Sequence, residues 1–117
     1  MNFLQKRIKA FECAFKGIYR MFRYETHAQI HLIAAIGVIV AGCLFRVSSL
    51  EWCVICICIG GVLMAEGFNT AIEKLADKVS REQDPLIGMA KDVAAGAVLI
   101  LAISTVVVAA LIFIPKF

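Results

Sequence analysis

The fold is decided by residues 52–77, which read WCVICICIGGVLMAEGFNTAIEKLAD. The first fourteen positions carry no formal charge, and four polar side chains then follow at spacings of three and four: Glu66, Asn69, Glu73 and Asp77. These spacings place the four side chains on one stripe of a single helix. Because carboxylates at the end of a membrane helix are costly to keep there, they are candidates for a functional site.

Two further uncharged apolar runs cover residues 28–45 and 93–114. A membrane span needs about 20 mainly apolar residues, within a range of roughly 17–25. Both runs meet this requirement, whereas residues 52–65 reach span length only if Glu66 lies near the lipid boundary. The polar stripe is therefore expected at a membrane surface and just beyond it.

Composition agrees with a membrane protein of one domain. The chain has 117 residues and is 62% hydrophobic, compared with roughly 45–50% in soluble domains. We predict an all-α integral membrane fold in which residues 1–117 form a single domain. Its expected parts are a surface helix at 1–26 and spans at 28–46, 50–79 and 92–115, the second span carrying a polar extension.

Residues 3–25 combine apolar positions spaced by three and four with six Lys and Arg residues. This pattern is typical of a helix that lies on an anionic membrane surface. The alternative is an ordinary amphipathic helix packed on protein.

Lysine and arginine predict the orientation. Ten of them lie in the N-terminal segment and in the connection after residue 73, whereas only Arg46 and Lys116 lie on the other side. The positive-inside rule then places the N-terminus and the acidic stripe in the cytoplasm. No signal peptide is expected, because the charged amphipathic stretch is too long for the start of one.

The acidic residues suggest chemistry on phosphates. Magnesium is usually held by one or two carboxylates together with substrate phosphates. A glutamate at the lipid boundary has its charged form disfavoured, which suits a general base, and Lys91 beside Asp92 suits a phosphate. Together they suggest phosphoryl transfer to a lipid hydroxyl. The alternative reading, a solvated helix with i,i+4 pairs, fits Glu73 and Asp77 equally well but fits Glu66 and Asn69 poorly.

Other classes of site are not supported. The chain has no P-loop and no soluble-kinase motif. Its C-x-x-C match, Cys53 to Cys56, lies inside an apolar helical run, where buried cysteine is expected to act as a small apolar residue. A different class of function would be a channel or transporter subunit that uses the carboxylates as an ion relay. Such a relay should spread acids through the depth of the spans, whereas here they gather at one interface.

Two blocks carry a resemblance to a known family. Residues 65–77, AEGFNTAIEKLAD, resemble the E-x-x-N-S/T-A-I-E-x-x-x-D signature of the prokaryotic diacylglycerol kinase family. Residues 90–99, AKDVAAGAVL, resemble its A-K-D-x-x-A/S-G/A-A-V-L block, and Lys16-Gly17 followed by Glu25 matches a third element. The resemblance covers nearly the whole chain, including the order of surface helix and three spans.

The resemblance implies an enzyme that transfers the γ-phosphate of ATP to a membrane lipid alcohol with the help of Mg²⁺. It implies a homotrimer in the bacterial inner membrane with active sites shared between subunits, and no nucleic-acid partner. Glu66 matches the general base, assisted by Asn69. The metal ligands match Glu25 and Glu73. Nucleotide contacts fall on these two glutamates and on Glu82, Asp84, Lys91 and Asp92.

The resemblance leaves two lipid substrates open. One branch of the family phosphorylates diacylglycerol to phosphatidic acid, and another phosphorylates undecaprenol. The tripeptides around His31 and Pro85 look more like the undecaprenol branch, although His31 fits a simple interfacial histidine equally well. Three positions depart from the residues common in the family: Gln29 replaces arginine, Asp84 replaces histidine and Cys13 replaces tyrosine.

Overall fold

The computed structural model describes residues 1–80 and 84–117, so the predicted nucleotide contact Glu82 lies outside the described residues. Every regular element in these two ranges is helical, which confirms the all-α prediction. The elements are α1 (Phe3–Tyr24), α2 (Thr26–Leu44), α3 (Ser49–Val79), α4 (Pro85–Phe113) and the short 3-10 helix η1 (Ile114–Lys116).

Three helical segments within the described ranges are long and apolar enough to cross a membrane: Thr26–Leu44, Ser49–Val79 and Pro85–Lys116. Large apolar side chains on all three point outward, as Ile33, Ile57 and Ile100 illustrate. In water such exposure would be unfavourable. In lipid it is the expected arrangement, because apolar side chains can face the lipid and only the backbone N–H and C=O groups need hydrogen bonds within the protein. The prediction of an integral membrane fold is confirmed.

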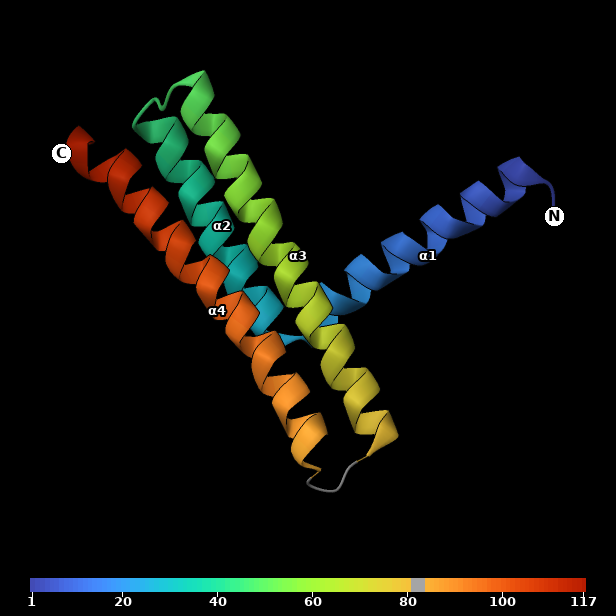
Figure 1. The fold of residues 1–117 in the computed structure, drawn as a ribbon. Helices are drawn as coiled ribbons and strands as arrows, with labels where there is room; N and C mark the ends of the chain where they lie inside the picture. The colour runs from blue at the N-terminus through green and yellow to red at the C-terminus, as the bar shows by residue number, and fades with distance from the viewer. Residues whose placement is uncertain (81–83) are drawn as a thin grey trace.

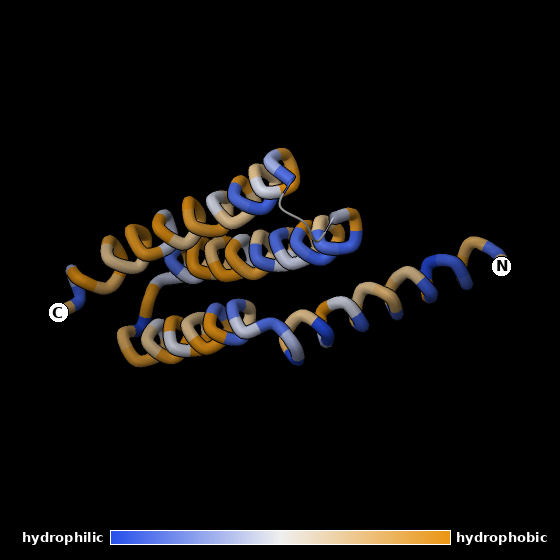
Figure 2. The backbone as a smooth tube through the Cα atoms, turned by 90° about the horizontal axis from the view of Figure 1, so that it is seen from below, coloured by the Kyte–Doolittle hydropathy of each residue, from blue (hydrophilic) through white to orange (hydrophobic). Residues whose placement is uncertain are grey.

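The three spans form a bundle in which α3 is the central helix. α3 packs against α4 on one side and α2 on the other, and Figure 2 shows it lying between them. α1 leaves this bundle at a wide angle (Figure 1), and no residue of α1 is buried. Its apolar residues, such as Phe11 and Phe15, are exposed. This exposure is what a helix resting on a membrane surface requires.

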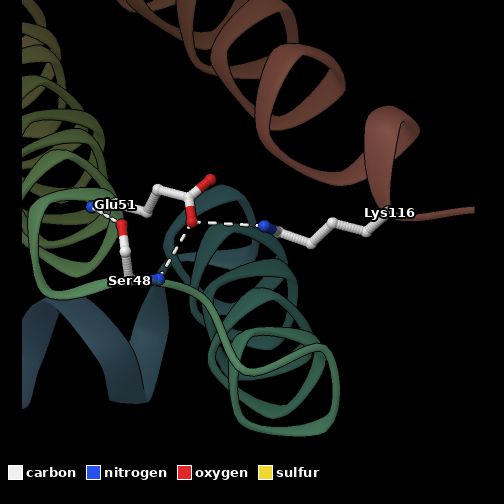
Figure 3. A network of polar contacts seen from close by, with 3 residues as sticks. All are labelled: Ser48, Glu51 and Lys116. Carbon is white, nitrogen blue, oxygen red and sulfur yellow. Dashed lines mark hydrogen bonds and ion pairs between the residues drawn. The ribbon is translucent and has the colours of Figure 1, made fainter.

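One end of the bundle holds the α2–α3 turn and the C-terminus. The buried residues Val47, Ile55 and Ile112 form a small core there. A polar network closes the same end (Figure 3): Glu51 N donates to Ser48 Oγ, Ser48 N donates to Glu51 Oε1, and Lys116 Nζ lies 3.2 Å from that oxygen. The first two bonds form a capping box at the start of α3. The Lys116 contact joins η1 to α3.

The joint between α1 and α2 lies near the middle of α3 (Figure 1). Gln29 Nε2 donates to Phe22 O and Arg23 O, at 3.0 and 3.2 Å. Carbonyls in the last turn of a helix lack intrahelical partners, so Gln29 fixes the end of α1 to the first turns of α2. Glu25 is the single residue between the two helices.

The helix that contains the third span begins at Pro85, seven residues before the expected span. Asp84 caps it, because its Oδ1 accepts from Leu86 N and Ile87 N at 2.8 and 3.3 Å. Proline in the first turn is favourable, because a backbone N–H at that position would have no intrahelical hydrogen-bond partner. The polar start of α4 therefore continues the helix beyond the apolar run, as the polar end of α3 does.

Candidate active site

The site is built on the part of α3 that lies level with the α1–α2 joint. Glu66 is 4% exposed and Asn69 is 8% exposed, and they are the two buried polar or charged residues of the described chain. Glu73 is half-buried and Asp77 is exposed. The stripe predicted from the spacing therefore runs from the interior of the bundle to its surface within three helical turns.

Glu66 faces α2. Its Oε2 lies 3.7 Å from His31 Nε2, and the two side chains are 5% and 23% exposed. Glu66 also lies within electrostatic range of His27, Glu25 and Glu73. A carboxylate in such a place needs a polar partner to offset the loss of hydration. His31 is the neighbouring polar group, at a distance longer than a hydrogen bond. The sequence had left two readings of this residue open, a simple interfacial histidine and a lipid contact.

Asn69 lies between Glu66 and Glu73 on the stripe. Its Nδ2 donates to Glu73 Oε1 at 3.2 Å. Its Oδ1 is buried and has no hydrogen-bond partner among residues 1–80 and 84–117. A buried acceptor without a partner is unfavourable in the free protein. It is suited to a donor that arrives with a ligand, such as a hydroxyl group.

Glu25 is one of the residues that line a groove between α1 and α3, which Glu66, Asn69 and Glu73 do not line. Its Oε1 is 3.3 Å from Lys74 Nζ, which links the α1–α2 joint to α3. The groove has a volume of about 610 Å³ and is lined by one face of α1, by Glu25, and by Gly67, Thr70 and Lys74 of α3. This volume falls in the range of roughly 300–1,000 Å³ found for small-molecule sites.

Lys91 of α4 reaches the stripe from the other side. Its Nζ is 2.7 Å from Asp77 Oδ1, with side chains 38% and 56% exposed. It also lies within electrostatic range of Glu73. Asp92 is exposed on α4, and the Asp84 carboxylate is engaged in the helix cap. The structure therefore brings Lys91 to the stripe but leaves Asp84 and Asp92 at the margin.

The donor set can be tested against a magnesium ion. No group of three or more His, Cys, Asp or Glu side chains converges in the part of the chain that the structure describes. Glu25 and Glu73 nevertheless both lie within electrostatic range of Glu66, and each is half-buried beside one polar partner. Magnesium needs only one or two carboxylates when substrate phosphates complete its shell. A site with fewer than three protein ligands is therefore compatible with an ion that arrives with a nucleotide, and Glu25 and Glu73 stay the predicted ligands.

Two basic residues of the groove were absent from the predictions. Arg20 lies on the face of α1 that lines it, and Lys74 pairs with Glu25. Lys74 stood beside Glu73 in the sequence and was read as part of the cytoplasmic charge. Lys74 could have been identified from its position, because a cation directly next to a predicted metal ligand is well placed to bind the phosphates that the metal would bind.

Comparison with known proteins gives consistent results. The family model for prokaryotic diacylglycerol kinase matches residues 12–113. An undecaprenol kinase from Bacillus subtilis is 40% identical over 115 residues, covering 98% of this chain and 94% of the relative. A diacylglycerol kinase from Synechocystis is 32% identical over 107 residues, covering 91% of this chain and 61% of the relative. The enzymatic prediction is confirmed at the level of lipid kinase, and the chain belongs to the prokaryotic diacylglycerol kinase family.

Proposed function

We propose that this lipid kinase transfers the γ-phosphate of ATP to the hydroxyl of a membrane lipid alcohol, with Glu66 as the general base. The observation that carries the proposal is the burial of Glu66, 4% exposed, at the polar end of an apolar helix and 3.7 Å from His31. A carboxylate in this position can meet a hydroxyl that enters from the lipid. An ordinary solvated helix extension would not bury it.

In the proposed reaction Glu66 takes the proton of the lipid hydroxyl while that oxygen attacks the γ-phosphorus. The bond between the γ-phosphorus and the β,γ-bridging oxygen breaks, and ADP leaves. A positioned general base contributes typically about 10²–10⁴-fold in rate. The free Oδ1 of Asn69 can accept a hydrogen bond from the acceptor alcohol or from a water molecule bound with it. Its Nδ2 keeps Glu73 in place.

The nucleotide would lie in the groove between α1 and α3. Glu25 and Glu73 would hold Mg²⁺, which when bound offsets the negative charge of the ATP phosphates. Lys91 would leave Asp77 and turn toward the phosphates, while Arg20 and Lys74 add positive charge along the groove. Asp84, Asp92 and Glu82 remain predicted nucleotide contacts from the family resemblance.

Undecaprenol is our first candidate for the acceptor, and diacylglycerol is the second. The support is the 40% identity to an undecaprenol kinase over almost the full length of both chains, against 32% to a diacylglycerol kinase. We further propose a homotrimer in the bacterial inner membrane with the groove on the cytoplasmic side. That side is favoured by the ten Lys and Arg residues in the N-terminal segment and in the connection after residue 73.

The test is transfer of labelled phosphate from ATP to lipid by the purified protein in vesicles that contain undecaprenol or diacylglycerol. We expect the wild-type protein to label undecaprenol more rapidly. Glu66→Gln should remove nearly all transfer while ATP still binds. Glu51→Gln is the matched control, since this glutamate lies on the same helix at the opposite end of the bundle. Equal turnover by Glu66→Gln and Glu51→Gln would exclude Glu66 as the base.

The rival function, a non-catalytic channel or transporter subunit, is not supported by the family match. The structure also offers no observation in its favour, because the buried carboxylate of the spans is a single residue, Glu66, in the described chain.

A further inference from the structure

An ion pair lies in the groove between α1 and α3. Glu25 at the α1–α2 joint and Lys74 of α3 both line this groove, and Lys74 Nζ is 3.3 Å from Glu25 Oε1. Arg20 of α1 is the other charged side chain that lines it in the described part of the chain. Two cations against one carboxylate give the groove a net positive charge, which suits an anionic ligand.

The two partners of this ion pair differ in their freedom to move. The side chain of Glu25 is 23% exposed, whereas that of Lys74 is 73% exposed. Glu25 ends α1 and precedes α2, so its backbone is held by both helices. Lysine carries its ammonium group on a flexible stem of four carbons. The pair therefore joins a carboxylate in a fixed place to a cation that can leave it.

A magnesium ion and the ammonium group of Lys74 are alternative partners of Glu25. Magnesium binds oxygen at about 2.0–2.1 Å, so an ion on Oε1 would lie within about 5.4 Å of the ammonium group at its present place. Two cations at that distance repel each other. Phosphate oxygens bound to the same ion would offer the displaced ammonium group a new acceptor.

We propose that Lys74 changes partners during the binding of the nucleotide: it neutralises Glu25 beforehand, and it donates to a phosphate oxygen when Mg²⁺ takes its place on the carboxylate. The inference rests on the proposed function, which assigns the metal to Glu25. Lys74 thereby has a role that a fixed phosphate-binding lysine lacks, because it competes with metal ions that arrive without a nucleotide. The site then favours the magnesium complex of ATP over the free metal.

Carbodiimide cross-linking can follow the change of partners, because the reagent joins a carboxylate directly to an amine in contact with it. The full-length protein in detergent should form a Glu25–Lys74 link, detected by mass spectrometry of its peptides. Magnesium with a non-hydrolysable ATP analogue should abolish most of this link. Glu51 and Lys116, 3.2 Å apart at the opposite end of the bundle (Figure 3), are the control pair, whose yield should not change. An unchanged Glu25–Lys74 yield with the analogue bound would overturn the proposal.

Binding of metal and nucleotide to variants is a second test. Lys74→Met removes the competitor, so Mn²⁺ alone, a paramagnetic substitute for Mg²⁺, should bind up to about fivefold more tightly. The same variant should bind ATP with magnesium about tenfold more weakly, because a charged contact with phosphate is lost. Lys74→Arg keeps the charge and should restore the affinity for ATP.

Lys78→Met is the matched control for the loss of charge. Lys78 is exposed one turn further along α3 and does not line the groove, so both affinities should stay unchanged. Weaker binding of both Mn²⁺ and ATP by Lys74→Met would show that the ion pair only holds the α1–α2 joint against α3. That result would refute the change of partners.

The two proposals fail in different ways. Transfer of phosphate to lipid, together with a Glu25–Lys74 link that persists when the analogue binds, would refute the change of partners and leave the kinase proposal standing. Loss of the link with magnesium and the analogue, in a protein that transfers phosphate to neither lipid, would support the change of partners and refute the proposed reaction.

Discussion

His31 Nε2 of α2 lies 3.7 Å from Glu66 Oε2 of α3, so a partly exposed side chain of one span lies next to the buried carboxylate of another. The relationship has two consequences. It gives Glu66 a polar neighbour at a depth where water is scarce. It also brings α2 and α3 together at the level of the candidate site. The polar neighbour of Glu66 thus comes from a different helix.

Replacing His31 should therefore slow catalysis through the position of Glu66. We expect His31→Gln to lower kcat by up to about a hundredfold, since a displacement of about 1 Å at a reacting group has an effect of that size. Affinity for ATP should stay unchanged. The measurement is single-turnover phosphate transfer at saturating lipid, together with ATP binding. His27→Gln is the control, because His27 is one turn away on α2 and exposed. Equal kcat values in the two variants would show that His31 does not position the base.

Glu73→Gln tests the proposed metal ligand with little structural change. The Gln side chain keeps an oxygen that can accept the hydrogen bond from Asn69 Nδ2, so only the charge is lost. We expect the magnesium concentration for half-maximal ATP binding to rise about tenfold or more, as loss of a charged ligand predicts. Titration of ATP binding with magnesium measures it. Glu12→Gln on the exposed face of α1 serves as the control. An unshifted midpoint would argue against metal binding by Glu73.

Variants of Lys91 and Asp77 can distinguish a contact of Lys91 with phosphate from a structural role of the Lys91–Asp77 ion pair. Their 2.7 Å ion pair is more than a third exposed on both sides, and exposed pairs contribute at most about 1 kcal/mol. Asp77→Asn should therefore change kcat/KM by less than about fivefold. Lys91→Ala should lower kcat/KM by about tenfold to a hundredfold, as loss of a charged hydrogen bond to a phosphate predicts. Comparable losses in the two variants would show that the ion pair itself matters, and that Lys91 has no separate contact with phosphate.

The helical stripe could be predicted because it depends only on the spacing of residues within one helix. Spacings of three and four put Glu66, Asn69 and Glu73 on one face of any helix, and the structure places the first two inside and the third at the margin. The spans could be predicted for a similar reason, since length and composition decide them.

The partners across helices could not be predicted from spacing. His31 meets Glu66, and Lys74 meets Glu25, because of how α1, α2 and α3 pack against one another. That packing depends on the close approach of small residues and not on a periodic pattern. Asp84 shows the reverse case, because a carboxylate just before Pro85 is a local signal of a helix cap, and the structure has Asp84 in that role. Its contact with the nucleotide stays a prediction.

Gly37 and Gly42 of α2 can be used to test how closely α2 packs on α3. A Cβ added to Gly42 would lie 2.6 Å from Cη2 of Trp52, and Trp52 packs against the core at this end. Gly42→Ala should therefore destabilise the protein by about 1–3 kcal/mol, the usual cost of overpacking. A Cβ at Gly37 meets no atom of the described chain within 4 Å, so Gly37→Ala should stabilise the helix by about 0.5–1 kcal/mol. Thermal unfolding of both variants in detergent should move the midpoint in opposite directions. Destabilisation of both to the same extent would show that loss of glycine, and not contact with Trp52, causes the effect.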